Sequence, residues 1–430
     1  MSQMKIFNVT PSARRLTNSL RDIGYDFVSA LADLVDNSIT AEASEVKIDI
    51  VFESGSSYIL ISDNGSGMTK SELTEALRFG TQKEYALNNL GRYGLGMKTA
   101  SISQCRRLSV LSRRSQNRRQ IVSMSLDLDH IDKTDRWEII EPQETPGVLA
   151  ALERLNLSQG TVVVWEDLDR IIPEKHQEDG WGRRRLEQSS EKAIEYLGLV
   201  FHRFLETSSA MDNPLVLTVN GSKVLPWNPF APDEPHREEL PIQSFEVITN
   251  GIVGEVVMRR YVLPSRNNFS TQDAFEQMSG PKKWNRQQGL YVYRADRIIQ
   301  FGGWSGIRSI DEHTKLARAS IEFQTDLDEV FQINVSKMKA SIPAEVRGLI
   351  ERPIQELCHR ADAKYRRDGH RSKRTGLKTS EVAPSPKYIN DLGPALVTAA
   401  INTGHYKALE NIMASLKKSH PEIAKSLGWE

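Results

Sequence analysis

The sequence predicts an α/β protein that ends in a helical segment. Residues 31–37 repeat apolar side chains at helical spacing, and the alternating segments 46–52 and 58–62 that follow read as the strands of a hairpin. A second group of alternating segments lies between residues 215 and 323, which is typical of a second sheet. The last stretch, 389–430, reads as two or three short helices.

Length and composition limit the kind of protein. The 430 residues suffice for two or three domains, and 39% hydrophobic with 26% charged residues is ordinary for a globular chain. The formal net charge is zero, so contact with nucleic acid would depend on local basic patches. Two cysteines indicate a reduced compartment, the nine histidines lack zinc spacing, and no apolar run suits a membrane span. We therefore expect a cytoplasmic protein without a membrane contact.

Residues 31–37, Leu-Ala-Asp-Leu-Val-Asp-Asn, are the first candidate for chemistry. Asp33 and Asn37 are four residues apart and would share one helix face, beside the apolar stripe of Leu34 and Val35. A carboxylate can accept a proton from water, and an amide oxygen can coordinate Mg2+. A helix with one solvated polar face gives the same pattern, so this stretch alone leaves both interpretations open.

A second candidate lies where the strand at 58–62 ends in Asp63-Asn64-Gly65-Ser66-Gly67-Met68. Gly65 and Gly67 would let the backbone approach a flat ring without Cβ clashes. Asp63 can accept a hydrogen bond from an exocyclic amine such as that of adenine. An Asp-Asn-Gly surface turn is the alternative interpretation.

The third candidate is Gly91-Arg92-Tyr93-Gly94-Leu95-Gly96-Met97-Lys98, which runs directly into a helix-forming segment. The N–H groups of such a loop can form an anion-binding nest, and Lys98 would add a positive charge. The glycine spacing fits neither the Walker nor the Rossmann pattern, and a glycine loop without a ligand is the alternative. The polar stretch 78–89 before it would form a lid, after a helix opened by a capping box at Thr69 and Glu72.

Three further segments complete the first domain. Residues 107–111 and 120–126 alternate as strands, and the run Arg106–Arg119 holds six arginines without an acid. That run predicts either a solvated hairpin or a nucleic-acid patch. Gly160-Thr161 introduces a buried strand, and we expect a long helix at 183–205 to close the domain.

We expect four parts along the chain. The domain boundaries are 1–208 for the first domain, 209–367 for the second, 368–388 for a basic linker and 389–430 for the helical segment. The second domain would begin with a hairpin at 215–224, contain another at 289–299 with its turn at Ala295-Asp296, and end in a helix at 346–367. Eight Lys and Arg between Arg360 and Lys378 predict a flexible basic tether, which is either merely solvated or a DNA contact.

The motifs occur in one order at compact spacing: Asp33…Asn37, Asp63-x-Gly65-x-Gly67, Gly91-x-x-Gly94-x-Gly96 and Gly160-Thr161. Together they resemble the GHKL ATPase superfamily over roughly residues 15–210, and the third motif is most similar to the MORC and MutL branches. The resemblance implies a Bergerat-type α/β sandwich with a mixed, largely antiparallel sheet. The second domain, with 289–299 and 334–339, resembles the smaller α/β transducer domain, of ribosomal-protein type, found in those branches.

The resemblance also implies a site for ATP and Mg2+. Asn37 would hold the Mg2+, Asp63 would bind the adenine amine, and Thr161 would support the base through water. Lys337, with Lys339 as the fallback, would reach the γ-phosphate from the second domain. The nucleotide-binding residues implied are Asn37, Asp63, Gly65, Gly67, Met68, Thr81, Gly91, Arg92, Tyr93, Gly94, Leu95, Gly96, Met97, Lys98 and Thr161.

One position departs from the superfamily. The general base is usually Glu, and here Asp33 stands in its place. Because Asp is one methylene shorter, hydrolysis would be slow or would act through an intervening water. Asp36, next to Asn37, would point to another helix face and is not expected to substitute.

The resemblance therefore implies an ATPase that works as an ATP-operated dimerisation switch. ATP would order the lid and the N-terminal arm, two chains would close, and hydrolysis would reopen them. Because the MORC and MutL branches act on DNA, repair or antiviral defence against foreign DNA is the expected setting, with Arg106–Arg119 and Arg360–Lys378 as candidate contacts. The alternatives are an ATP-sensing scaffold that recruits an effector such as a nuclease, a kinase of the histidine-kinase type, and a chaperone-like role.

Overall fold

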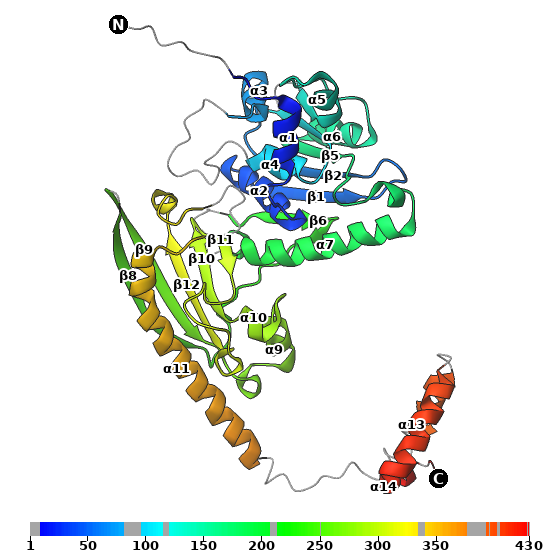
Figure 1. Ribbon diagram of the computed structural model, residues 1–430, viewed down its shortest axis with the longest axis vertical. Coiled ribbons are helices and arrows are strands. Elements are labelled where there is room, and N and C mark those ends of the chain that lie inside the picture. The colour runs from blue at the N-terminus through cyan, green and yellow to red at the C-terminus, as the bar shows by residue number, and fades with distance from the viewer. Residues whose placement is uncertain are drawn as a thin grey trace. The chain divides into compact units, whose positions relative to one another are not determined.

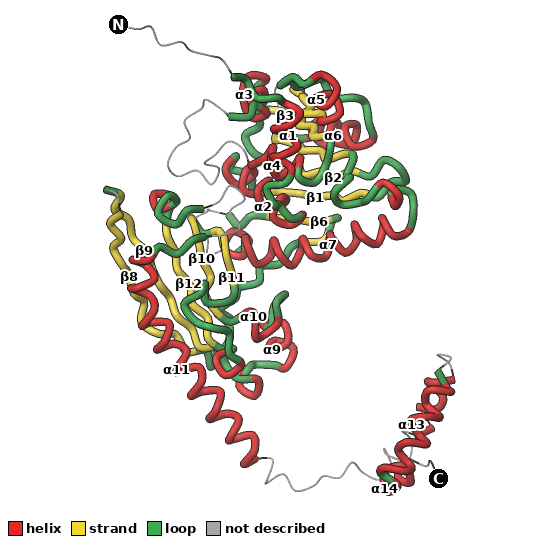
Figure 2. The backbone as a smooth tube through the Cα atoms, viewed as in Figure 1, coloured by secondary structure: helices red, strands yellow, loops and turns green. Residues whose placement is uncertain are grey.

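The computed structural model of the chain describes residues 9–80, 96–114, 120–206, 213–249, 251–333, 340–375, 393–394, 396–401, 405–427 and 429. Contacts divide the chain into two compact units, Met1–Tyr365 and Arg366–Glu430, which we treat separately. The first unit holds two sheets with helices packed on them (Figure 1). Figure 2 shows the mixture of helices and strands along the backbone. The predicted α/β class with a helical C-terminal segment is confirmed.

The first sheet has seven strands in the order β4-β3-β5-β2-β1-β6-β7. Neighbours pair antiparallel, except that β1 pairs parallel with β6. The sheet is therefore mixed and largely antiparallel, as predicted. Its strands are β1 (Glu45–Val51), β2 (Tyr58–Asp63), β3 (Arg107–Arg113), β4 (Val122–Asp127), β5 (Gly160–Glu166), β6 (Val216–Val219) and β7 (Ser222–Lys223).

Helices cover both faces of this sheet because its central strands carry apolar side chains on both sides. Ile59 and Ile61 of β2 share a core with α2, whereas Tyr58 and Leu60 of the same strand pack with α6. The helices of this part are α1 (Ala13–Arg21), α2 (Phe27–Thr40), α3 (Lys70–Leu77), α4 (Gly96–Ile102), α5 (Leu128–Thr134), α6 (Pro146–Leu157), α7 (Gly180–Val200) and α8 (His202–Leu205).

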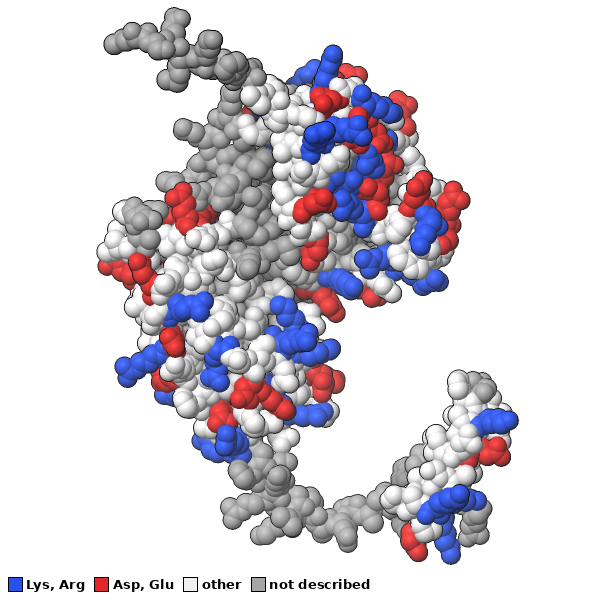
Figure 3. Space-filling model, in the orientation of Figure 1, with Lys and Arg blue, Asp and Glu red and all other residues white. Residues whose placement is uncertain are grey.

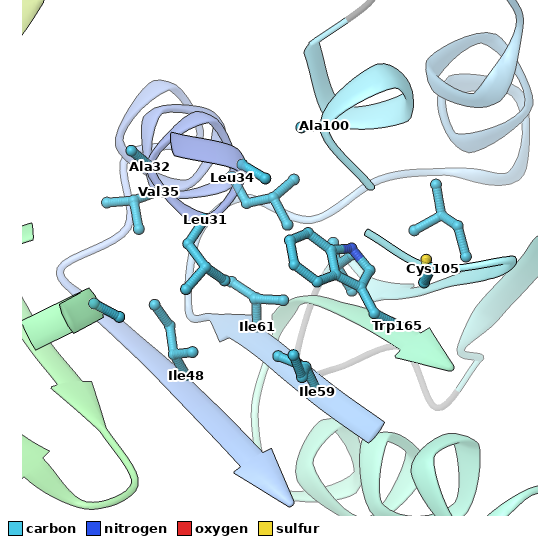
Figure 4. Packing of buried hydrophobic residues seen from close by; sticks show 14 of the residues in the cluster. Leu31, Ala32, Leu34, Val35, Ile48, Ile59, Ile61, Ala100, Cys105 and Trp165 are labelled. Atoms are coloured by element: carbon cyan, nitrogen blue, oxygen red, sulfur yellow. The ribbon is translucent and has the colours of Figure 1, made fainter. Parts of the chain in front are cut away.

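Helix α2 is anchored at its start and along its buried face. Asp26 caps it by accepting a hydrogen bond from the Ser29 N–H, which satisfies one of the unpaired donors of the first turn. Leu31 and Leu34 are buried and lie toward the strands and Trp165 in Figure 4. Burial of a leucine side chain contributes about 1.5–3 kcal/mol, so this face fixes the rotation of the helix and hence where its acids point.

The second sheet has five strands in the order β11-β10-β12-β9-β8, with only β10 and β12 parallel. Helix α11 packs on it through Val346, Ile350, Ile354 and Leu357, which recur at helical spacing in one core with the strands. The strands are β8 (Glu238–Thr249), β9 (Ile252–Val262), β10 (Gly289–Arg294), β11 (Arg297–Phe301) and β12 (Ala317–Phe323), and the helices are α9 (Gln272–Met278), α10 (Lys283–Gln287) and α11 (Ala344–Thr375).

Three details differ from the sequence-based expectations. The hairpin at 215–224 extends the first sheet through β6 instead of opening the second domain. The helix expected at 346–367 continues to Thr375, so the first part of the predicted basic linker is helical. The long helix at 183–205 divides at Phe201 into α7 and α8. The four domain boundaries themselves stay a prediction.

The second unit consists of short helices. They include α13 (Tyr406–Ser419) and α14 (Pro421–Ser426), whose start is set by a proline at its first position. Across the described parts of both units, every helix is too short or too polar to cross a membrane.

Candidate active site

Asp33 lies on the buried face of α2. Its side chain is 1% exposed, and its Oδ2 accepts a hydrogen bond of 2.6 Å from the Tyr25 hydroxyl. A Cβ placed on Gly96 would stand 3.4 Å from the same carboxylate, so the start of α4 lies directly beside Asp33. The structure therefore brings together the first and third predicted motifs. Burial and the neighbouring carboxylate both raise the pKa of Tyr25, which keeps its hydroxyl a donor.

A cation from the second sheet also reaches Asp33. Arg297 of β11 is 1% exposed, and its Nη2 lies 3.5 Å from Asp33 Oδ1 while its Nη1 lies 2.9 Å from Asp36 Oδ2. The prediction placed Asp36 on an unrelated helix face, but the guanidinium is wide enough to span both acids. Burial disfavours the charge on Arg297, but Asp36 and Asp33 outweigh it and raise the arginine pKa.

Asp63 is held at the end of β2 by three donors. Its Oδ1 accepts from the N–H of Gly65 at 2.9 Å and of Thr161 at 3.3 Å, and its Oδ2 accepts from the Ser38 hydroxyl at 3.2 Å. Burial nevertheless raises the pKa of Asp63, because the three hydrogen bonds only partly offset the loss of water. The carboxylate is thus oriented before any ligand arrives. Thr161 contacts the carboxylate directly through its backbone N–H, and the expected link through water stays a prediction.

The glycines around Asp63 are required by packing within the chain. A Cβ on Gly65 would stand 2.6 Å from the Ala41 carbonyl oxygen. Gly67 has φ +64°, a left-handed conformation that side chains disfavour, and its Cβ would collide with the backbone of Arg113. The sequence alone explained both glycines by the approach of a ligand. The structure gives them a sufficient reason without one, which is to let the turn close against α2 and β3.

Two serines missed by the sequence reasoning complete this corner. Ser38 follows Asn37 on α2 and reaches Asp63, as described above. Ser112 of β3 accepts from the Met68 N–H at 2.8 Å, and its hydroxyl lies 3.0 Å from that of Thr161. Both serines stand inside segments chosen for other reasons. Only the strand order, which places β3 and β5 together, shows why Ser112 belongs to the site.

Lys98 has a partner within the protein. Its side chain is 1% exposed, and its Nζ donates to the carbonyl oxygen of Ala76 at 2.7 Å, in the last turn of α3. Burial lowers the pKa of Lys98 to about 8, opposed by Glu75. The ammonium therefore stabilises the α3 C-terminus, where a cation suits the helix dipole. Its predicted role as a phosphate-binding charge stays a prediction.

This lowered pKa predicts a specific pH dependence of stability. Between about pH 8 and the ordinary lysine value near 10.4, the unfolded chain keeps the Lys98 proton that the folded chain has released. The free energy of unfolding of the wild type should therefore rise through this window relative to Lys98→Met. Urea unfolding of both proteins at pH 7 and pH 10 measures the difference. An unchanged difference between the two pH values would contradict the burial of a titrating Lys98.

Asn37 is a half-buried residue one turn after Asp33 on α2. Among the described residues, no group of three or more His, Cys, Asp or Glu forms a metal site. Mg2+ is usually held by one or two protein ligands together with substrate phosphates and waters. A single amide oxygen therefore fits an ion that arrives with a triphosphate, and it does not fit a resident metal.

Several predicted residues lie outside the described parts of the chain. They are Thr81, Gly91, Arg92, Tyr93, Gly94, Leu95, Lys337 and its fallback Lys339. Their assignments stay predictions. The structure describes Gly96, Met97 and Lys98 of the third motif, with Met97 packed against the core of the first sheet.

The described arginines of the run Arg106–Arg119 have partners in the protein. Arg113 donates to two backbone carbonyls of α6. The ion pairs are Arg106 with Asp129 at 2.6 Å and Asp132 at 2.8 Å, Arg107 with Asp127 and Asp167 at 3.1 Å each, and Arg114 with Glu72 at 3.0 Å. On the face drawn in Figure 3, acidic and basic side chains are interspersed. These contacts favour the solvated-hairpin interpretation for this part of the run.

The oriented acid Asp63 thus lies beside the helix that carries the buried Asp33 and the amide of Asn37. Residues 25–159 match the family of histidine kinase-, DNA gyrase B- and HSP90-like ATPases. This part of the chain is a GHKL-superfamily ATPase domain near the MORC and MutL branches.

Three relatives carry the likeness to those branches. The ATPase morc-1 of Caenorhabditis elegans is 31% identical over 87 residues, which are 20% of this chain and 10% of that protein. The DNA mismatch repair protein MutL of Aliivibrio fischeri is 46% identical over 90 residues, 20% of this chain and 14% of the relative. MutL of Fervidobacterium nodosum is 34% identical over 113 residues, 25% of this chain and 19% of the relative. The likeness thus covers a small share of each relative's length.

Proposed function

We propose that the chain binds ATP with Mg2+, hydrolyses it, and uses the cycle to close and reopen a homodimer that acts on DNA. The observation that carries the proposal is the orientation of Asp63 by Gly65, Thr161 and Ser38. An acceptor fixed in this way recognises the exocyclic amine of adenine without further ordering. Asp33 and Asn37 share the neighbouring helix, one turn apart.

In the proposed reaction, a water attacks the γ-phosphorus while the bond to the ADP oxygen breaks in line with it. Asp33 accepts the proton of that water. Asn37 would hold the Mg2+, which neutralises charge on the phosphate oxygens when it is bound. Lys337, or Lys339, would contact the γ-phosphate from the second domain and so report whether it is present.

The second candidate is an ATP-sensing scaffold with little turnover. The specific observation behind it is that Asp33 is buried and already has Tyr25 and Arg297 as partners. The ion pair and the donated hydrogen bond both favour the charged form of a carboxylate, so these two contacts oppose the transfer of a proton from water. Such a chain would close on ATP and recruit an effector, for example a nuclease, without a rapid cycle.

The proposed role on DNA rests on the relatives, because those named MutL are DNA mismatch repair proteins. Since Arg106, Arg107 and Arg114 are ion-paired, we assign the DNA contact to the basic stretch Arg360–Lys378 and to a surface completed in the dimer. Arg360 itself pairs with Glu238 at 2.9 Å and Lys364 donates to the His236 carbonyl oxygen at 2.9 Å, so DNA would compete with these contacts at the start of the stretch.

Sedimentation with a labelled DNA duplex tests this assembly. We expect a monomer without nucleotide, and a dimer with Mg2+ and a non-hydrolysable ATP analogue. DNA should sediment with the dimer at low salt and separate as salt is raised, because phosphate contacts release counterions. A monomer in all conditions would contradict the dimer, and DNA binding that is absent or insensitive to salt would contradict the DNA role. Dimerisation without steady phosphate release would favour the scaffold.

A further inference from the structure

The contact between Arg297 and the acids of α2 joins two parts of the chain that are far apart in sequence. Arg297, Asp33 and Asp36 are each no more than 1% exposed. A buried charge is tolerated only when it is paired, so each group depends on the others to stay in place. The two terminal nitrogens of one guanidinium lie 2.9 Å from Asp36 and 3.5 Å from Asp33, so a single buried cation of β11 pairs with both acids.

The backbone that carries Arg297 is held in turn. It follows a two-residue hairpin turn in which Ala295 and Asp296 both have positive φ, at 45° and 66°. This left-handed pair matches the twist of the flanking strands β10 and β11. The direction in which Arg297 leaves the turn is therefore set by a tight and well-defined geometry.

Helix α8 clamps the same hairpin from the side of the first sheet. Arg203 of α8 donates to Asp296 at 2.9 Å and to Glu322 of β12 at 2.7 Å, and its guanidinium lies 3.9 Å from the Tyr293 ring centroid. His202 bonds the Tyr293 hydroxyl at 2.8 Å. The hairpin and its neighbouring strand are therefore held from α8 through Arg203 and His202, and Arg297 connects the hairpin to the candidate base on α2.

We propose that Arg297 is a positioning residue for ATP hydrolysis, which holds the Asp33 carboxylate in its working orientation and makes that orientation depend on the docked second sheet. This inference rests on the proposed ATPase function. Tyr25 fixes one oxygen of Asp33 and Arg297 approaches the other, so rotation of the short side chain is restricted from both sides. Because the side chain of Asp is shorter than that of Glu, fewer of its conformations bring the carboxylate to the attacking water, so its orientation matters more.

The test compares Arg297→Gln and Arg297→Lys with the wild-type full chain. We expect kcat to fall by about 100-fold in Arg297→Gln, the scale of a misplaced catalytic group, while the Kd for ATP stays within about threefold. Lysine restores a charge but cannot span both acids, so Arg297→Lys should recover part of kcat. A residue with a purely structural role would not give this separation of kcat from Kd, nor this order of variants.

Arg294→Gln is the matched control. Arg294 is a similarly buried arginine on β10, opposite Arg297 in the same hairpin, and its guanidinium pairs with Asp328 at 2.6 Å. It should lose stability and keep the kcat of the folded protein. If Arg297→Gln does not fold, Arg297→Lys against Arg294→Lys decides, with at least about a fivefold fall in kcat expected only for Arg297→Lys.

Each outcome bears on the inference. Arg297 variants with the kcat of the wild type, or with a loss equal to that of the Arg294 variants, would overturn the positioning role while the ATPase function stands. A wild type that binds ATP but releases no phosphate would overturn the proposed hydrolysis, and the positioning role with it. The expected separation of kcat from Kd, confined to Arg297, supports both.

Discussion

Replacement of Asp33 by Asn is expected to lower kcat for ATP hydrolysis by roughly 10²–10⁴-fold, the usual contribution of a general base. The change is nearly isosteric, which matters because the site is 1% exposed and closely packed. The amide oxygen can still accept from the Tyr25 hydroxyl, so the local fold should survive. What the amide cannot do is take a proton from water. ATP affinity should change by only a few-fold, since Asp33 is not assigned to ATP binding.

Phosphate release and nucleotide binding, measured separately, check this expectation. Asp49→Asn is the matched control, because Asp49 lies on β1, pairs with Arg154 and contacts none of the candidate site residues named here. It should leave kcat unchanged. Equal turnover by the wild type and Asp33→Asn would show that Asp33 is not the base. A slow wild type that Asp33→Asn does not slow further would favour the scaffold.

The parts of the site that lie close together in sequence could be predicted. Asp33 and Asn37 share a helix whose apolar spacing is strong, and Asp63 ends a clearly alternating strand. The hairpin at 289–299 and its turn at Ala295-Asp296 were also predicted correctly. In each case a local pattern of apolar and turn residues is sufficient to specify the conformation.

The contact that Arg297 makes after the turn at Ala295-Asp296 could not be predicted. In the sequence, Arg297 is a charged residue at the end of a hairpin turn, and Asp36 was expected to point to another helix face than the site. Their pairing depends on the docking of two sheets, which no periodicity along the chain encodes. The same limit explains the hairpin at 215–224, whose local form was predicted correctly but whose sheet was not. Strand pairing with β1 is a long-range choice.

The extension of α11 to Thr375 follows from the helix propensity of its residues, which the sequence-based prediction underestimated. The run of Lys and Arg after Arg360 was interpreted as a tether because like charges repel. Both residues are nevertheless good helix formers, and the helix continues from a segment already packed on the second sheet, up to Thr375. Propagation of an existing helix costs far less than nucleation, so a charged run that follows a docked helix is better predicted as helical.

The second large effect is expected for Asp63→Asn. The ionised carboxylate accepts from the amine of adenine in the proposed complex, and the amide of Asn would point a donor at that donor. Loss of a hydrogen bond to a charged acceptor costs about 1.5–3 kcal/mol, so the Kd for ATP should rise roughly 10- to 150-fold. The folded chain should not lose stability at pH 7. Burial raises the pKa of Asp63 in the folded chain. At a pH above the folded and unfolded pKa values, the buried charge therefore lowers the free energy of unfolding, and a neutral Asn removes this cost.

The preference between bases gives the sharper test of the same prediction. Guanine presents a carbonyl oxygen where adenine presents the amine, and the Asn amide can donate to it. Asp63→Asn should therefore lower the affinity for ATP and narrow or reverse the preference for ATP over GTP. Ser38→Ala should lower the affinity for ATP without changing that preference. The Ser38 hydroxyl donates to Asp63 Oδ2 and to the Leu34 carbonyl oxygen, so its removal loosens the carboxylate and leaves its chemistry unchanged. An equal fall in the affinities for ATP and GTP in Asp63→Asn would mean that Asp63 supports the turn at Gly65 and does not distinguish the bases.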